Sequence, residues 1–152
     1  MLLAFALASL LAADAPACPP AGPAIVVDTR AHRLALCEDG AVARQFDVAI
    51  GENGPAPKRV GRAQTPLGRF TLAAPRPSKQ FHVFVPLENP DPKRFRAWAI
   101  GIHGPQRGWE RAGHVNVESD WTLGCIAVAS DEEIDAIAGW VRARRVRRID
   151  VR

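Results

Sequence analysis

The chain has few cysteines and histidines and no apolar run of membrane-spanning length. It has three cysteines and four histidines, and no pair among them has close metal-ligand spacing, so we expect no metal site and no cofactor. Tyrosine is absent, methionine occurs once, and aromatic residues make up 7% of the chain. No apolar run is long enough to cross a bilayer, which argues against a stable membrane span.

What is present suits one domain. The 152 residues are 47% hydrophobic and 24% charged, which is enough for a buried core and leaves no room for a second domain of ordinary size. We find no internal repeat and no low-complexity tract. Residues 16–23 form a proline-rich lead-in, and residues 24–152 form the domain itself.

The first 15 residues resemble a signal peptide. The apolar stretch 1–13 is too short to span a bilayer, and Ala13-Asp14-Ala15 supplies small residues for cleavage. No Lys or Arg precedes Arg30, so either the α-amino group provides the usual positive charge or the start codon is misassigned. Because such a peptide directs export, we expect a protein of the periplasm or cell envelope. The alternative is that this segment forms a buried N-terminal helix.

Short apolar runs separated by turn residues predict a mainly β domain. The runs cover residues 25–27, 34–37, 42–50, 70–72, 81–87 and 97–102, and Gly, Pro, Asp and Asn gather between them. The last of these runs places His103 at a strand end. Val146, Ile149 and Val151 indicate one more strand near the C-terminus.

One helix is predicted after the single cysteine in the second half of the chain. Ser130 can cap it, and Glu133 completes a capping box three residues later. Apolar residues then recur at helical spacing and predict a buried face, at Ile134, Ile137, Ala138 and Val141.

That cysteine carries the strongest functional signal. It lies in Asp120-Trp121-Thr122-Leu123-Gly124-Cys125-Ile126, and His103-Gly104 lies 22 positions upstream. A thiol beside a glycine offers an accessible sulfur and a backbone that substrate can approach closely. Because a thiol of pKa ~8.5 is mostly protonated at neutral pH, it needs a base, and His103 is the best candidate. The pattern predicts cysteine-dependent acyl transfer.

These residues resemble the signature of the L,D-transpeptidases, the YkuD-domain family of bacterial cell-wall enzymes. That signature pairs His-Gly or His-Ser with a downstream Ser/Thr-x-Gly-Cys and an apolar residue. The run Gly61-Arg62-Ala63-Gln64-Thr65-Pro66-Leu67-Gly68-Arg69-Phe70 resembles the family's x-Thr-Pro-x-Gly-x-Phe turn, which precedes a strand of the catalytic core. The resemblance runs from Ile25 to the C-terminus. It implies a β-sandwich of mixed sheets with one flanking helix, and a catalytic domain over 24–152.

The resemblance also implies roles for individual residues. Cys125 would be the nucleophile and His103 the general base, oriented by the main-chain carbonyl of Gly104. Main-chain N–H groups around Gly124 and Cys125 are the natural donors to the oxyanion of the tetrahedral intermediate, and we assign Gly124 this role. Thr122 would position the cysteine turn.

Two positions depart from the common family pattern. Many members carry Arg or Asn two residues after the cysteine and His two residues before it, whereas this chain has Ala127 and Leu123. The Asp-Trp-Thr-x-Gly-Cys-Ile-Ala version resembles a proteobacterial subgroup. Trp121 and His114 are our candidates for substrate binding; buried packing for Trp121 and a solvated loop for His114 are the alternatives.

Export changes how the other cysteines are interpreted. In an oxidising compartment Cys18 and Cys37 can pair and leave Cys125 as the odd thiol. The sequence leaves open whether they pair or stay separate, because it does not show how closely their Cα atoms approach.

The resulting hypothesis is an L,D-transpeptidase acting on peptidoglycan stem peptides. Cys125 would attack the diaminopimelate carbonyl of a tetrapeptide, expel D-alanine and hold the acyl group for an acceptor. Another stem peptide, a lipoprotein lysine and water are all open as acceptors, so a hydrolase on the same fold (L,D-carboxypeptidase, endopeptidase or lipoprotein-releasing amidase) is the alternative.

Two further alternatives carry less support. A sortase would place its histidine much further upstream and an arginine on a strand shortly after the cysteine, where this chain has Ile126-Ala127-Val128. A wall-binding module without catalysis would keep the fold but not use Cys125. We expect no nucleic-acid partner, since an exported basic protein meets anionic wall and lipid groups first.

Overall fold

The computed structural model describes residues 16–57, 61–88 and 100–152. The predicted signal peptide over 1–15 and the first half of the apolar run over 97–102 lie outside these residues. Within the described part of the chain, no helix is both long and apolar enough to cross a membrane.

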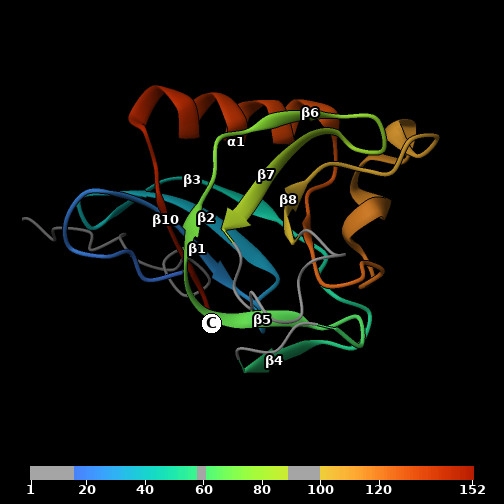
Figure 1. Ribbon diagram of the computed structural model, residues 1–152, viewed down its shortest axis with the longest axis horizontal. Helices are drawn as coiled ribbons and strands as arrows, with labels where there is room; N and C mark the ends of the chain where they lie inside the picture. Colours follow the sequence, from blue (N-terminus) through green and yellow to red (C-terminus); the bar gives the residue numbers. More distant parts are fainter. Residues whose placement is uncertain (1–15, 58–60, 89–99) are drawn as a thin grey trace, which may run out of the picture.

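The described residues form ten strands, one α-helix and one kinked 3-10 helix (Figure 1). The first five strands are β1 (Pro23–Asp28), β2 (Arg33–Glu38), β3 (Ala41–Asp47), β4 (Pro55–Pro57) and β5 (Thr65–Leu72). Then follow β6 (Arg76–Ser78), β7 (His82–Glu88), β8 (Gly101–His103), the 3-10 helix η1 (Glu110–Val117), β9 (Ile126–Ala127), α1 (Asp131–Arg144) and β10 (Arg148–Val151).

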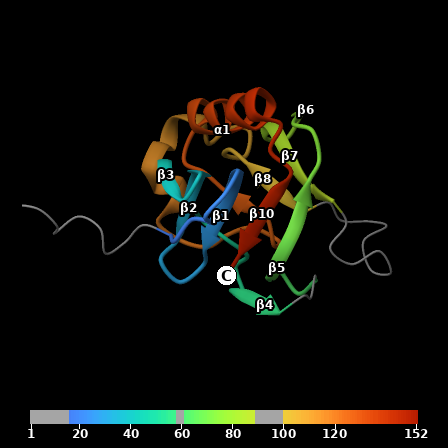
Figure 2. The same cartoon turned by 90° about the vertical axis from the view of Figure 1, so that its left-hand side faces the viewer.

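The strands form one mixed sheet in the order β3-β2-β1-β10-β5-β7-β8-β9. Strand β10, from the C-terminus, lies between β1 and β5; it is parallel to β1 and antiparallel to β5 (Figure 2). Strand β4 pairs with β5, and β6 pairs with β7. The expected mainly β fold with mixed strand directions is confirmed.

Strand β7 joins the two halves of this sheet. Its last residues, Leu87 and Glu88, pair with β5, whereas the preceding residues pair with β6 and β8. The second half ends in the short parallel pair β8–β9, with Ile102 level with Ile126 and His103 level with Ala127. This pair brings the residue after Cys125 beside the strand of His103.

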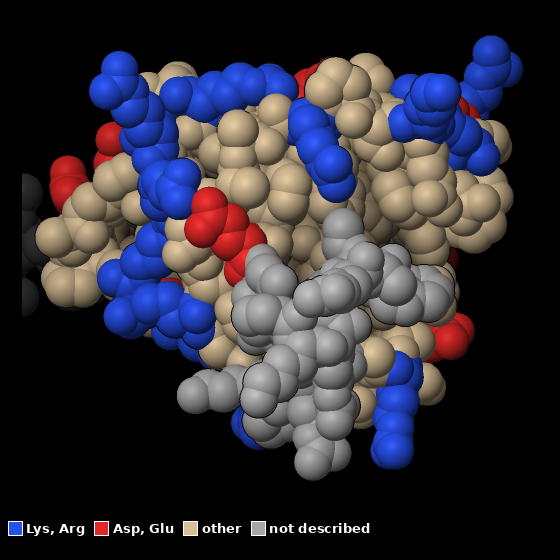
Figure 3. Space-filling view, in the orientation of Figure 1, with Lys and Arg blue, Asp and Glu red and all other residues tan. Residues whose placement is uncertain are grey.

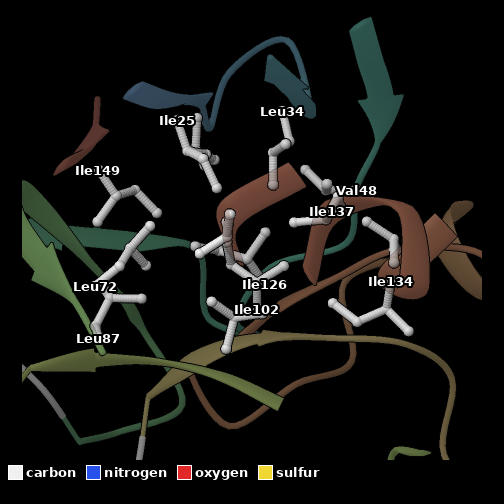
Figure 4. Close-up of a cluster of buried hydrophobic side chains, with 14 of the residues drawn as sticks. Ile25, Leu34, Val48, Leu72, Leu87, Ile102, Ile126, Ile134, Ile137 and Ile149 are labelled. Atoms are coloured by element: carbon white, nitrogen blue, oxygen red, sulfur yellow. The ribbon is translucent and has the colours of Figure 1, made fainter. Parts of the chain in front are cut away.

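Helix α1 covers the core, as Figures 1 and 4 show. Its buried face is the predicted one, and Ile134 and Ile137 belong to the same buried cluster as side chains of the sheet, several of which Figure 4 labels. Ser130 caps the helix by accepting a hydrogen bond from the Glu133 N–H at 3.2 Å, while the Glu133 carboxylate accepts from the Ala129 N–H at 2.8 Å. The N-cap at Ser130 is confirmed, whereas the Glu133 carboxylate bonds one residue before the N-cap N–H that a capping box would use.

The opposite face of β1 and β2 is covered by the lead-in. Ile25 and Val27 face the main core, whereas Val26 packs with Ala35 and Cys37 on the other side. Cys37 forms a disulfide with Cys18, with Cα atoms 5.5 Å apart, so the cross-link ties the lead-in to the sheet. A loop of this length gives a disulfide worth about 3 kcal/mol in the chain-entropy model.

Four elements of the described chain were not predicted: the short strands β4, β6 and β9, and the 3-10 helix η1. The 3-10 helix η1 has no helical repeat of apolar residues, and Gly113 breaks it with a φ of 59°. It lies in the long connection between β8 and β9, close to the end of the sheet that carries His103.

Three of the six arginines in the C-terminal segment 142–152 pair with carboxylates: Arg144, Arg147 and Arg148. Lys and Arg side chains spread over the upper part of the face in Figure 3, where α1 lies. Arg144 contacts Glu38 at 2.9 Å and Arg147 contacts Glu88 at 2.8 Å. These exposed pairs contribute little stability but offset much of the local positive charge.

Candidate active site

His103 is held as a neutral base at the end of β8. Its side chain is buried, and its Nδ1 lies 2.7 Å from the carbonyl oxygen of Gly104. A carbonyl only accepts, so Nδ1 carries the proton and Nε2 is left as an unprotonated acceptor. Burial lowers the pKa of His103 to about 4, and the Gly104 hydrogen bond opposes this only in part.

Aromatic rings enclose the imidazole. Phe81 stacks on it with centroids 3.7 Å apart and ring planes 16° from parallel. Trp121 meets it edge-on at 5.7 Å. These rings exclude water from His103, which is the physical origin of its lowered pKa. Sequence reasoning missed Phe81, since nothing around it forms a motif.

Cys125 lies just before β9, next to β8. Its side chain is 9% exposed, and burial raises the pKa of its thiol to about 11, while a main-chain hydrogen bond from Gly101 has the opposite, smaller effect. Ala127, two residues later, is level with His103. Burial therefore favours the neutral form of both the thiol and the imidazole at pH 7.

The turn that carries Cys125 is closed by Thr122. The Thr122 hydroxyl donates to the Cys125 carbonyl at 2.7 Å and accepts from the Gly124 N–H at 3.1 Å. Its main chain is tied to the segment that follows β3, where the Ile50 carbonyl accepts from the Thr122 N–H at 3.2 Å. These contacts support the predicted positioning role of Thr122.

The same contacts correct the prediction for Gly124. Its N–H donates to Thr122 and is thus part of the turn, so it is not aimed at an oxyanion. The glycine is required for another reason: its φ is +126°, and an added Cβ would lie 2.7 Å from the Gln64 carbonyl oxygen. The Cys125 N–H remains the main-chain donor expected from sequence.

Asp120 anchors the start of the turn. Its carboxylate accepts from the Ile50 N–H at 2.8 Å and lies 3.0 Å from His32 Nε2. The sequence offered Asp120 and His32 no shared motif, because 88 positions separate them.

Of the two candidate substrate-binding residues, one lies at the site. Trp121 contacts His103 as above, donates from its indole N–H to the Asn116 carbonyl at 2.9 Å, and packs edge-on against Trp109 at 5.3 Å. Trp109 is 46% exposed, and Leu123, inside the cysteine turn, is 56% exposed. His114 is exposed on η1 and faces Asp47 at 3.6 Å, away from the contacts that surround His103.

Metal chemistry has no donor set among the described residues: no group of three or more His, Cys, Asp or Glu side chains gathers there. The arrangement instead suits acyl transfer, with a thiol just before β9 and a neutral imidazole at the end of the neighbouring strand β8, both buried.

Comparison with known proteins agrees with this geometry. The family model of the YkuD L,D-transpeptidase catalytic domain matches residues 22–149. The chain belongs to this family. The comparison with curated proteins gave no match.

Solved L,D-transpeptidases share the fold at low sequence identity. The chain is similar to the enzyme from Mycobacterium smegmatis, with 20% identity, a TM-score of 0.55, and coverage of 87% of this chain and 59% of that one. The helical cell shape determining protein Pgp2 from Campylobacter jejuni gives 17% identity, a TM-score of 0.64, and coverage of 86% and 47%. The catalytic domain of the E. faecium L,D-transpeptidase gives 17% identity and a TM-score of 0.58, with coverage of 86% of this chain and 96% of that one.

Several of these proteins are longer than this chain. It spans 46–62% of the length of the first three solved structures in the comparison and nearly all of the isolated E. faecium domain. The shared part is thus the catalytic domain of the L,D-transpeptidase family.

Within this family domain, Ala127 has a structural explanation. It is fully buried, exchanges main-chain hydrogen bonds of 2.8 and 2.9 Å with Ala49, and packs with Val117 and Ala129. A long polar side chain at this position would have to displace that cluster. In this chain the position serves packing.

Proposed function

We propose that the protein is an exported cysteine acyltransferase that acts on peptidoglycan stem peptides through a Cys125 acyl-enzyme. The observation that carries this is the hydrogen bond from His103 Nδ1 to the Gly104 carbonyl, which leaves Nε2 as the acceptor on the strand beside Cys125. Membership of the L,D-transpeptidase family supports the same reaction class.

The proposed reaction has two steps. In the first, Cys125 Sγ bonds to the diaminopimelate carbonyl carbon, the bond to D-alanine breaks, and the thiol proton passes through His103 Nε2 to the departing amine. In the second, an acceptor amine gives its proton to His103 and attacks the thioester carbon. The carbon–sulfur bond breaks, and His103 returns the proton to the sulfur. With another stem peptide as acceptor the product is a cross-link.

Hydrolysis on the same scaffold is the second candidate. It differs only in the acceptor, water instead of an amine, and the described residues around His103 do not distinguish the two. A lipoprotein lysine as acceptor also fits the chemistry.

Export is supported by the Cys18–Cys37 disulfide, since such cross-links persist in oxidising compartments. It is also consistent with the predicted signal peptide and with a wall substrate. We therefore place the enzyme in the periplasm or cell envelope as part of the proposal.

The test uses the purified chain with a disaccharide-tetrapeptide and with cross-linked wall fragments, and mass spectrometry of the products. We expect released D-alanine and a dimer, both lost in Cys125→Ala. The matched control is Cys18→Ala with Cys37→Ala, which removes two sulfurs outside the site and keeps the products below its unfolding temperature.

Each other result has a defined meaning. Tripeptide or severed cross-links without dimer, still dependent on Cys125, would establish a hydrolase. Products that persist in Cys125→Ala would overturn the assignment of the nucleophile. A chain that binds wall fragments but forms no adduct with a carbapenem would be a binding module.

A further inference from the structure

The Thr65 hydroxyl is a buried polar group that the proposed chemistry does not use. Thr65 begins β5, is fully buried, and lies in the Thr-Pro-x-Gly-x-Phe run. Its Oγ1 donates to the Gly124 carbonyl at 3.0 Å and accepts from the Gly51 N–H at 2.9 Å. One donor and one acceptor contact occupy the hydroxyl in both roles, so its direction is fixed.

The contact with Gly124 controls the peptide that joins Gly124 to Cys125. The Gly124 C=O and the Cys125 N–H belong to one planar trans peptide and point in opposite directions. Whatever holds the carbonyl therefore also sets the direction of the Cys125 N–H. Thr122 holds the two adjacent peptides, through the Gly124 N–H and the Cys125 carbonyl.

Glycine makes this contact necessary. A peptide bonded to a glycine rotates more freely than others, and Gly124 has a φ of +126°. The hydrogen bonds of the Thr122 hydroxyl go to the Gly124 N–H and the Cys125 carbonyl. The Gly124 carbonyl instead accepts from Thr65, which lies 59 positions earlier in the chain.

We propose that Thr65 is a positioning residue that directs the main-chain N–H of Cys125 toward the oxyanion formed during acylation. This inference rests on the proposed function. When Sγ bonds to an acyl carbon, the carbonyl electron pair moves to oxygen, and the Cys125 N–H donates to the resulting negative charge. The Thr65 hydroxyl bonds to Gly124 and Gly51, so an effect transmitted through the Cys125 N–H is expected only in reactions that form an oxyanion.

Two reactions of the same thiol separate this role from a structural one. Acylation by a carbapenem forms an oxyanion, whereas alkylation by iodoacetamide displaces iodide at a saturated carbon and forms none. Both rates are read by intact-protein mass spectrometry. We expect Thr65→Val to slow acylation at least tenfold and to leave alkylation within about twofold, and Thr65→Ser to restore acylation, since losing an oxyanion donor costs about 10²–10³ in rate.

The matched control is Thr29→Val. Thr29 is also buried, and its hydroxyl donates to a main-chain carbonyl, that of Arg152, at 2.9 Å, far along the sheet from Cys125. This variant should keep both rates, which shows that loss of a buried hydroxyl is not itself the cause.

Three results would overturn the inference. Acylation of Thr65→Val at the wild-type rate would do so, as would a parallel fall of both rates, which would indicate a collapsed turn. If circular dichroism shows that Thr65→Val does not fold, the same two rates are measured in Thr65→Ala. This variant removes the hydroxyl without placing a methyl group beside Gly124. A wild-type chain that is alkylated but never acylated would overturn the proposed function, and this inference with it.

Discussion

The centre of the site and its rim are built in opposite ways. His103 and Cys125 are 1% and 9% exposed, between packed strands and aromatic rings, whereas Trp109 and Leu123, which we call the rim, are 46% and 56% exposed. In the centre, burial keeps both reacting groups neutral and hydrogen bonds fix their direction. At the rim, apolar side chains face solvent, and exposed apolar groups beside a reactive centre are typical of substrate contact.

We infer from this difference that the proposed reacting groups lie apart from the side chains that would contact substrate. A change in the centre should alter chemistry or folding by large factors, because few alternative arrangements exist in a close-packed interior. A change at the rim should alter substrate affinity with little effect on the fold. The predictions below test that separation, beginning with the largest effect.

Replacing the buried base should nearly abolish acyl transfer. We expect His103→Gln to lower the rate of acylation by about 10²–10⁴, since a positioned general base contributes this much. The exposed His114, 66% exposed at its side chain, is the matched control, and His114→Gln should stay within about twofold. Carbapenem acylation rates measure both; a folded His103→Gln variant with the wild-type rate would contradict the assignment of the base.

Adding one carbon to the cysteine turn should destabilise the fold. In Gly124→Ala the new Cβ would lie 2.7 Å from the Gln64 carbonyl oxygen in a backbone region that alanine rarely adopts, so we expect a loss of about 4 kcal/mol. Gly139, exposed in α1 with nothing near its Cβ position, is the control: Gly139→Ala should stabilise by about 0.5–1 kcal/mol. Urea unfolding measures both, and equal effects would contradict the geometry of the turn.

The neutral His103 should make stability depend on pH. Its pKa is about 4 in the folded chain and 6.5 unfolded, so the unfolded state binds more protons between these values. The contribution of His103 to the free energy of unfolding is therefore fully present above pH 6.5. It falls by about 3 kcal/mol as the pH drops to 4. Carboxylates also lose stabilising interactions in acid, so the free energy of unfolding is measured for both wild type and His103→Gln. The difference between the two should shrink from pH 7 to pH 4. A constant difference would indicate that the pKa of His103 is the same in the folded and the unfolded chain.

The smallest effect is expected at the rim. Leu123→Ala should change the free energy of unfolding by less than about 0.5 kcal/mol, as most exposed substitutions do. Its KM for wall fragments should rise severalfold while iodoacetamide alkylation stays unchanged. Val115→Ala, another exposed apolar residue at 61% but on η1, should leave KM unaltered. A lower alkylation rate in Leu123→Ala would show that the rim also shapes the centre.

Much of the fold was accessible from sequence because it is local. Six apolar runs predicted strands, and the capping pattern at Ser130 predicted the start of α1. What failed was nonlocal or irregular. The very short β9 has two residues and no period of its own, and η1 has an interrupted backbone.

The candidate site divides in the same way. Cys125 and His103 were found because each sits in a short run of characteristic residues, although their catalytic roles remain predictions. Phe81 and Asp120 act through contacts with His103 and Ile50 that join distant segments, so no local pattern marks them. The prediction that the Gly124 N–H serves the oxyanion was wrong, because Thr122, two residues away, takes that hydrogen bond.

The sequence by itself determined the class of fold, the capped helix and the identity of the thiol and imidazole, because each depends on residues a few positions apart. Only the tertiary structure decided the protonation of that pair, the Cys18–Cys37 cross-link and the contact between Thr65 and Gly124. Those three depend on which distant groups exclude water or come within bonding distance, and that is fixed when the strands pair and not before.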